Sequence, residues 1–516
     1  MSQLATVAPE WIESTLVQRD GRDPLGLQTT TQDRLMPALL PDINELTRRA
    51  RYFSFYASLL GQFEEDRRPA MRTELSGYIK AREYELALAV LRCPRGCGSS
   101  PVGAMRVHGL AHSDVTEFDR GESVESNNGG YGLYYRSSMI AFDVSVPAGT
   151  PIGDTTTPID VLARRDIARQ LADAFRDAVA DTDYHRRYLH SSDPIPASVI
   201  DEYAEVACLC RLDQFTDERE LITTTMLQAP HEQLQVAVEQ RRRSMAHYLN
   251  ILDDQPEVHD DNPTFRAALW DPVTVHSATH RDVADQWAAL VLKDLFQDAA
   301  CSLWTHFLRE SLAAGGQDGL TREQLEGVFA TLAERPPELD PAAPTVDQLD
   351  TLDLPRGHAE LLRRTVAEAD TATAGLGALA ALPCLVASRD TNGWRQATAV
   401  ASAWQPSVAQ IAAEVEAHLT TRPTVQDTMR WAIRRLILMP HERIAYSKLP
   451  EFTFRFRVGA SGLRFYDLDH DRFILAGIRH PALGTLTQDL GYWRPNDGED
   501  PEVTARGRAF VQDVLA

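Results

Sequence analysis

Apolar residues recur at intervals of three and four positions along most of the chain, which is the spacing of one face of an α-helix. The first such run covers 45–63 and places Phe53, Tyr56 and Leu60 on a common face. Thr321 followed by Gln324 predicts a capping box at a helix start. The sequence therefore predicts a mainly α protein. The other amphipathic runs are 82–92, 164–179, 231–252, 282–310 and 321–333.

Alternation of apolar and polar residues, the pattern of a β-strand, is confined to short stretches. In 452–467, Phe452, Phe454 and Phe456 alternate with polar residues, and a Gly-Ala-Ser-Gly turn leads into a second alternating run. A weaker hairpin signal surrounds Asn392-Gly393, because Asn-Gly is typical of two-residue hairpin turns. We therefore expect small β-hairpins within a multi-domain helical protein.

Proline-rich stretches predict the domain boundaries. The strongest covers 335–358, where repeated prolines cannot continue a helix and predict a linker or an ordered loop. Weaker breaks lie at 190–196 and 420–424. The expected domains are an N-terminal helical or winged-helix-like domain over 1–190, a helical middle domain over 191–420 that contains the loop 335–358, and a winged-helix-like C-terminal domain over 421–516.

The end of the chain resembles a winged helix. Two short helices are expected at 471–478 and 481–490, followed by an aromatic strand, a turn-rich stretch and a last helix that Thr504 would cap. In that fold the helix before the strands enters the DNA major groove and the wing contacts phosphates. The segment 129–142, GGYGLYYRSSMIAF, is a second winged-helix-like candidate, in which Tyr131, Tyr134, Tyr135 and Arg136 either stack on bases or pack in the core.

The composition is that of an ordinary globular protein, with 43% hydrophobic and 24% charged residues. Asp and Glu number 74 against 52 Lys and Arg, so the net charge is −22. This acidity weighs against a surface that binds nucleic acid or an anionic membrane throughout. Six cysteines in 516 residues do not form a disulfide framework. With neither a secretion signal nor a membrane-length apolar run in view, we expect a cytoplasmic protein with no membrane partner.

Arginines are concentrated locally near the C-terminus. The segment 422–494 has 11 Arg and one Lys against seven acidic residues, a net charge of +5. The spacing of its arginines allows a phosphate track, and the polar residues of 481–490 are candidates for base contacts, although that helix contains no Arg. The favoured interpretation is a structural or docking role, with the arginines on a solvated sheet face or against an acidic domain of the same chain. The candidate nucleic-acid-binding residues are Arg434, Arg435, Arg455, Arg457, Arg464, Thr485, Thr487 and Gln488.

One spacing is typical of a metal site. Cys93-x3-Cys97-x10-His108-x3-His112 lies close to the Cys2His2 range, although Gly109 stands between the histidines and the apolar residues of a finger core are absent. Cys208 and Cys210 are further candidate ligands. The candidate cofactor is a structural zinc ion, whereas the favoured interpretation is a set of buried free thiols with surface histidines.

Two groups of residues would suit an enzyme. His276 and His280 are four apart with Asp271 and Asp282 nearby, which is the composition of a catalytic metal site. Lys448, one of only three lysines, lies between Glu442 and Glu451. A lysine with nearby acidic residues is the composition of a metal-dependent nuclease site. Neither a P-loop nor a zincin or nucleophile-elbow motif occurs in the sequence.

Three stretches resemble uncharacterised bacterial proteins encoded in antiviral defence islands: 23–60, GGYGLYYRSSM, and HERIAYSKLPEFTFRFRVGASGLRFYD near the C-terminus. The resemblance implies a genomic context and no mechanism. Our first hypothesis is a non-catalytic component of an antiphage defence or DNA-transaction complex. Its partner would be a helicase, nuclease or ATPase of the same system, or double-stranded DNA. The alternatives are a metal-dependent nuclease or other hydrolase, and a scaffold that binds only protein.

Overall fold

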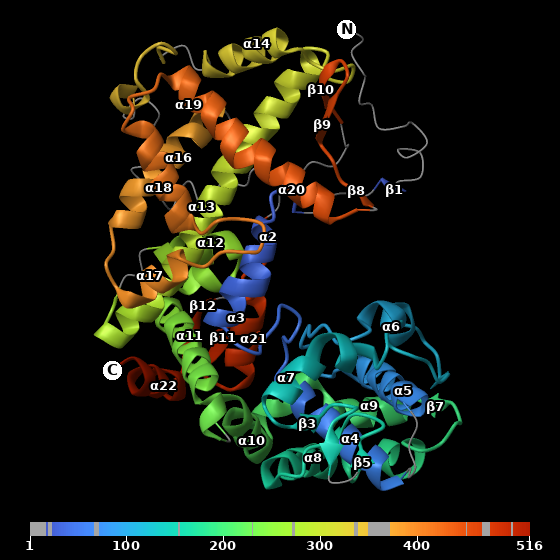
Figure 1. The fold of residues 1–516 in the computed structure, drawn as a ribbon. Helices are drawn as coiled ribbons and strands as arrows, with labels where there is room; N and C mark the ends of the chain where they lie inside the picture. The colour runs from blue at the N-terminus through green and yellow to red at the C-terminus, as the bar shows by residue number, and fades with distance from the viewer. Residues whose placement is uncertain are drawn as a thin grey trace. The chain divides into compact units, whose positions relative to one another are not determined.

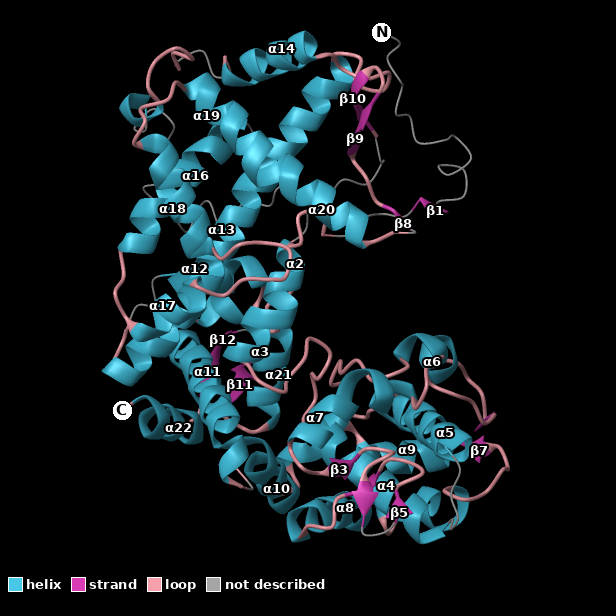
Figure 2. Ribbon diagram, in the orientation of Figure 1, coloured by secondary structure: helices cyan, strands magenta, loops and turns pink. Residues whose placement is uncertain are grey.

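Helices dominate the structure, a computed structural model that describes residues 17–18, 23–66, 72–152, 155–229, 231–270, 274–334, 339–348, 372–449, 451–466, 475–496 and 499–516 (Figure 1). Figure 2 shows how few strands accompany the helices, and the strands of the described residues pair only in twos. The predicted mainly α fold with small hairpins is confirmed. Within these ranges, no helix combines the length and the apolar character needed to cross a membrane.

The chain forms two compact units, each assembled from distant segments. The first unit contains 1–39, 260–478 and residue 516, and the second contains 40–259 and 479–515. This division differs from the three consecutive domains expected from the proline-rich breaks. The break at 190–196 lies inside the second unit because β7 (Ile195–Pro196) pairs with β2 (Glu117–Phe118). The break at 420–424 lies inside the first, where the N–H of Thr345 donates to Pro423 O at 2.8 Å.

The second unit has an aromatic core around α4. The rings of Tyr52 and Tyr56 are 5.4 Å apart, and Tyr135 lies 5.0 Å from Tyr52. Each of these tyrosines is at most 2% exposed. Its helices are α4 (Arg51–Asp66), α5 (Arg72–Leu91), α6 (Ala104–Ala111), α7 (Arg136–Ala141), α8 (Asp166–Val179), α9 (Ala197–Ala207), α10 (Thr216–Leu227), α11 (Gln235–Asp254), α21 (His480–Asp489) and α22 (Ala505–Leu515).

The segment 129–142 belongs to this core rather than to a nucleotide-stacking surface. It forms the π-helix η2 (Tyr131–Tyr135) and then α7, and both Tyr131 and Tyr135 are buried. The carboxylate of Glu83 accepts hydrogen bonds from the N–H groups of Gly130 and Tyr131, at 2.9 and 2.8 Å. Gly129 has a φ of +59°, and a Cβ there would lie 2.4 Å from Glu83 Oε2. The Gly-Gly pair therefore lets the backbone approach a buried carboxylate.

The first unit is built around α13 (Ala278–Ala313), a long helix that is buried over most of its length. It packs against α16 (Ala372–Ala387) and α17 (Asn392–Thr398). A Cβ on Gly375 would lie 2.8 Å from Ala299 O, so this glycine allows α16 its close approach to α13. The other helices are α2 (Leu27–Thr30), α3 (Met36–Leu39), α12 (Asn262–Trp270), α14 (Arg322–Ala333), α18 (Val408–Leu419), α19 (Val425–Ala432) and α20 (Met439–Ser447).

The predicted hairpin at 452–467 is present but shorter than expected. β9 (Phe456–Gly459) and β10 (Gly462–Phe465) are antiparallel, with Phe456 opposite Phe465. On its other side, β10 exchanges two backbone hydrogen bonds between Leu463 and Leu320, at 2.8 and 2.9 Å. Gly462 has a φ of +122°, and a Cβ there would lie 2.0 Å from Leu320 O. The hairpin is therefore joined closely to the segment after α13.

Two local predictions fail within the described residues. Asn392-Gly393 does not form a hairpin turn, since the Thr391 hydroxyl accepts from the N–H of Trp394 at 3.1 Å and starts α17. No helix forms over 475–478, the described part of the predicted helix 471–478. By contrast, the capping box of Thr321 and Gln324 at the start of α14 is confirmed. The Pro-rich stretch 335–358 is described only over 339–348, which form an ordered loop.

The range expected to form a winged-helix-like C-terminal domain is divided between the two units. The hairpin β9–β10 lies in the first unit, whereas α21, the hairpin of β11 (Trp493–Asn496) with β12 (Glu499–Val503), and α22 lie in the second. Thr504 caps α22 as predicted, because its hydroxyl accepts from the N–H of Gly507 at 3.1 Å. In its unit α21 packs against α11. The range 421–516 is therefore divided at 478–479.

Candidate metal centre

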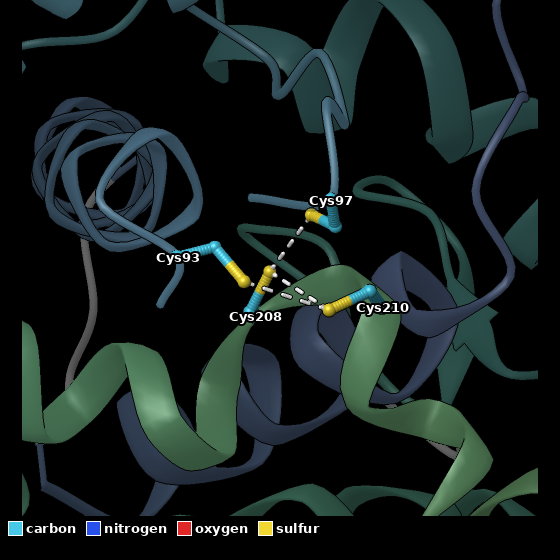
Figure 3. A group of neighbouring side chains, drawn as sticks. All are labelled: Cys93, Cys97, Cys208 and Cys210. Atoms are coloured by element: carbon cyan, nitrogen blue, oxygen red, sulfur yellow. Dashed lines mark hydrogen bonds between the residues drawn. The ribbon is translucent and has the colours of Figure 1, made fainter. Parts of the chain in front are cut away.

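Four cysteines from two distant parts of the chain converge in the second unit (Figure 3). Cys93 and Cys97 belong to the turn that follows α5. Cys208 ends α9, and Cys210 lies in the 3-10 helix η4 (Leu209–Asp213). Figure 3 shows all four side chains pointing toward one another. The cluster therefore joins a Cys-x3-Cys turn to a Cys-x-Cys turn.

The sulfur atoms are spaced for coordination of a single ion. The distance is 3.6 Å for the pair Cys93 and Cys210, 3.6 Å for Cys97 and Cys208, and 3.5 Å for Cys208 and Cys210. All four Sγ atoms lie within 4.8 Å of one another. A zinc ion with four Zn–S bonds of about 2.3 Å separates its sulfurs by about 3.8 Å. A disulfide would require about 2.05 Å, and all four thiols are free. The cluster can therefore bind a metal ion.

Glycines shape the turn that carries Cys93 and Cys97. The N–H of Gly96 donates to Cys93 O at 2.9 Å, which closes the turn. Gly96 and Gly98 have φ values of +57° and +63°, in the left-handed region that other residues seldom occupy. The glycines on both sides of Cys97 thus allow a tight turn that brings the thiols of Cys93 and Cys97 to the same cluster.

Arg51 of α4 holds the backbone that carries Cys208. One of its guanidinium nitrogens donates to Val206 O at 2.6 Å and to Cys208 O at 2.7 Å. Another forms a salt bridge of 3.0 Å with Glu218 of α10, and both charged side chains are at most 1% exposed. The same guanidinium lies 4.7 Å from the centre of the Phe215 ring. Because this arginine is paired and enclosed, it fixes the end of α9 through buried hydrogen bonds.

The thiols of the cluster differ in pKa. Hydrogen bonds from Cys208 and Cys210 lower the pKa of the Cys97 thiol far below its usual range, and Ser99 acts in the same direction. Hydrogen bonds with Cys210 and Cys97 raise the pKa of the Cys208 thiol. These hydrogen bonds favour a thiolate within the cluster. A divalent cation replaces the remaining protons and allows all four sulfurs to be thiolates.

Two arginines place positive charge beside the cluster. Arg49 donates to Ser99 Oγ at 2.5 Å and forms a bidentate ion pair with Asp489. Ser99 Oγ in turn lies 3.3 Å from Cys97 Sγ. Arg95, inside the Cys93–Cys97 turn, pairs with Asp213 at 2.7 Å. Because each arginine is paired with a carboxylate, its main effect on the cluster is to hold Ser99 and the Cys93–Cys97 turn in place.

His108 and His112 are not among the ligands that the structure brings together. His108 lies on α6 and His112 follows it, with their rings 5.0 Å apart. Both side chains are exposed, and the group that can hold an ion contains only the four cysteines. Cys93 and Cys97 were thus predicted with the wrong histidine partners. Cys208 and Cys210 were recognised only as further candidates, because the sole signal in the sequence is their close spacing.

The predicted nucleic-acid-binding arginines differ in burial and in the groups that they contact. Arg455 is 3% exposed, and Arg435 pairs with Glu414 at 2.7 Å. Arg457 and Arg464 lie 5.4 Å and 5.3 Å from the ring centres of Phe454 and Tyr466. Arg434 is exposed on the π-helix η9 (Ile433–Leu438). Arg457 and Arg464 stand opposite each other in the β9–β10 hairpin, and a nucleic-acid role for the exposed arginines stays a prediction.

The predicted base-reading residues of α21 are engaged within the second unit. The Thr485 hydroxyl donates to Arg48 O and Pro481 O. Thr487 is fully buried and donates to Leu483 O at 2.6 Å, while Gln488 is half-buried. These hydroxyls thus serve the packing of α21.

The residues that would suit an enzyme do not gather into a site either. Lys448 Nζ donates to Asp23 O at 3.1 Å, and Glu442 is exposed. His280 is fully buried, and its Nδ1 accepts from the N–H of His276 at 3.2 Å. Asp271 lies outside the described residues. In the part of the chain that the structure describes, the four thiols alone meet the geometry of a metal site.

Comparison with protein-family models, curated proteins and solved structures finds no match to this chain.

Proposed function

We propose that the protein binds one zinc ion through Cys93, Cys97, Cys208 and Cys210. The observation that carries this proposal is the convergence of four thiols within 4.8 Å. Thiolates select zinc and other soft ions over Mg²⁺ and Ca²⁺, which prefer oxygen ligands. An iron–sulfur cluster is disfavoured, because its thiolates bind different iron atoms and stand further apart than ligands of a single ion.

The zinc ion has a structural role in this proposal. Four thiolates complete a tetrahedron, whereas catalytic zinc keeps one position open for water or substrate. The ligand pairs are 117 and 111 residues apart in the sequence. A metal that closes so long a loop removes many conformations from the unfolded chain and favours the folded one. The ion would therefore fasten the turn after α5 to the end of α9.

Metal analysis of the purified protein tests this proposal directly. We expect about one equivalent of zinc per chain by mass spectrometry of the metals, as one tetrahedral site requires. Replacement of zinc by Co²⁺ should produce the visible absorption of a cobalt ion bound tetrahedrally by four thiolates. The assignment would be overturned by two results together. These are a zinc content below roughly 0.1 equivalent per chain after zinc-supplemented expression, and no visible spectrum with cobalt.

Variants locate the ion. Cys97→Ser and Cys208→Ser should each lose the bound zinc and lower the thermal midpoint, because three thiolates hold zinc far more weakly than four. The matched control is Cys384→Ser, which removes an exposed cysteine of the first unit and should retain the metal. Full zinc content in a Cys97→Ser/Cys208→Ser double variant would place the ion elsewhere.

The wider role that fits a closed metal site is non-catalytic. We retain the proposal of a component in a bacterial defence or DNA-transaction complex that binds DNA or a protein partner. Its DNA form predicts affinity for a labelled duplex that falls by orders of magnitude between about 50 and about 200 mM salt. Absence of binding at the lower salt concentration would remove DNA and leave a protein partner.

A further inference from the structure

A cleft in the first unit combines an exposed aromatic ring, an apolar floor and an arginine. Its volume is about 270 Å³, and it lies where α18, η9 and α20 meet the loop before α18. Trp404 and Arg443 line it, together with Ile411, Leu436 and Met439. This volume is slightly below the range of about 300–1,000 Å³ that is typical of small-molecule sites. The size favours a single ligand group over an extended polymer.

Trp404 is held in an exposed position. Its side chain is 40% exposed, whereas Trp287, Trp304 and Trp394 are at most 2% exposed. The next residue, Gln405, is buried and donates to Leu25 O at 2.5 Å. A hydroxyl of the same loop, that of Ser402, accepts from the N–H groups of Trp404 and Gln405 at 3.2 and 3.0 Å. The ring is thus presented by an ordered loop, which lowers the entropic cost of stacking on it.

The cleft has one positive charge to offer to a ligand. Arg435 forms a bidentate pair with Glu414, at 2.7 and 2.8 Å, so its charge is already compensated. Arg443 is exposed, and no hydrogen bond or ion pair joins it to another described residue. A guanidinium in this setting binds carboxylate or phosphate through paired N–H donors. Met439, 52% exposed at the edge of the cleft, adds a flexible apolar contact.

We infer that this cleft binds a small anion that carries a planar ring. The ring would stack on Trp404, and the phosphate or carboxylate would pair with Arg443. Mononucleotides and aromatic carboxylates both have this chemistry. The inference concerns the first unit and is independent of the zinc site, which lies in the second.

Calorimetric titration with adenosine monophosphate and with indole-3-acetate tests the inference. At least one probe should bind the full-length protein, and the better of the two identifies the anion as phosphate or carboxylate. Adenosine and inorganic phosphate, titrated separately, should each bind at least tenfold more weakly, because each lacks one of the two contacts. Failure of both ring-bearing anions to bind at millimolar concentration would overturn the inference.

Two variants assign the contacts to their residues. Arg443→Gln and Trp404→Ala should each weaken binding by about tenfold or more, as expected for a charge-assisted pair and for a stacked ring. Both side chains are exposed, so thermal midpoints close to that of the original protein should show that the fold is retained. The matched control is Arg434→Gln, an exposed arginine outside the lining of the cleft, which should bind normally. Unchanged affinity in Arg443→Gln would also overturn the inference.

Discussion

At the scale of single residues, the partners of a buried charged side chain decide whether its charge is compensated. Arg51 is among the most enclosed groups of the second unit, yet its charge is compensated by Glu218 and by two carbonyl oxygens. Asp298 in α13 is different, because its Oδ1 is buried with no hydrogen-bond partner in the described structure. Burial and the nearby Asp294 raise the pKa of Asp298 to about 8, although Arg266 and Lys293 oppose the shift. This carboxyl group therefore links stability to pH.

The sign of that linkage follows from where the proton is bound. Between the ordinary pKa of 3.8 and the folded pKa of about 8, the folded protein retains the Asp298 proton and the unfolded chain loses it. Stability from this group is therefore complete below pH 3.8 and falls as pH rises, by at most about 1.4 kcal/mol per pH unit. We expect Asp298→Asn to be more stable than the original protein at pH 8, and the difference to shrink at pH 5. Denaturant unfolding at both pH values measures this, and an equal difference at the two would contradict the raised pKa.

At the scale of secondary-structure elements, local signals and tertiary contacts compete. The capping residues Thr321 and Thr504 are recognisable in the sequence because a cap involves only three or four successive residues. Asn392-Gly393 has an equally local signal for a hairpin turn. There a helix forms instead, with Thr391 as its cap and Gly393 against the backbone of Asp282. The contact with α13 thus overrides the turn propensity.

The close packing of α16 on α13 makes a prediction about glycine. Gly375→Ala should lower the free energy of unfolding, because the new Cβ would lie 2.8 Å from Ala299 O, a backbone atom. The control is Gly327→Ala in α14, where a Cβ would have no neighbour within 4 Å. That exchange should stabilise by about 1 kcal/mol through helix propensity alone. Denaturant unfolding compares the two, and stabilisation by Gly375→Ala would show that α16 can move away at little cost.

At the scale of the whole molecule, the proposed zinc site and the candidate ligand cleft belong to different compact units. Each unit draws on distant parts of the chain, so neither corresponds to one of the consecutive domains that the proline-rich breaks indicate. The ligands of the proposed zinc ion are all in the second unit. Metal loss should consequently destabilise one unit more than the other.

Hydrogen exchange measures this difference. After zinc removal, the backbone amides of α5, α9 and η4 should lose protection, because the ion is the bridge between their ends. The amides of α13 and α16, in the first unit, should change much less. Cys384→Ser is again the control, and it should leave both patterns unchanged. Equal loss of protection in α9 and α13 would argue against a metal clamp within one unit.

The sequence by itself determined the helical class, several helix starts, the hairpin around 459–462 and half of the metal centre. These features depend on residues that are neighbours along the chain, where side-chain spacing and backbone conformation act directly. Only the tertiary structure decided that Cys-x3-Cys meets Cys-x-Cys rather than His108 and His112. It also buried Arg455 and left Arg443 exposed beside Trp404. The physical reason is that such pairings depend on how distant helices pack, and this is set by the sum of many weak contacts rather than by any local motif.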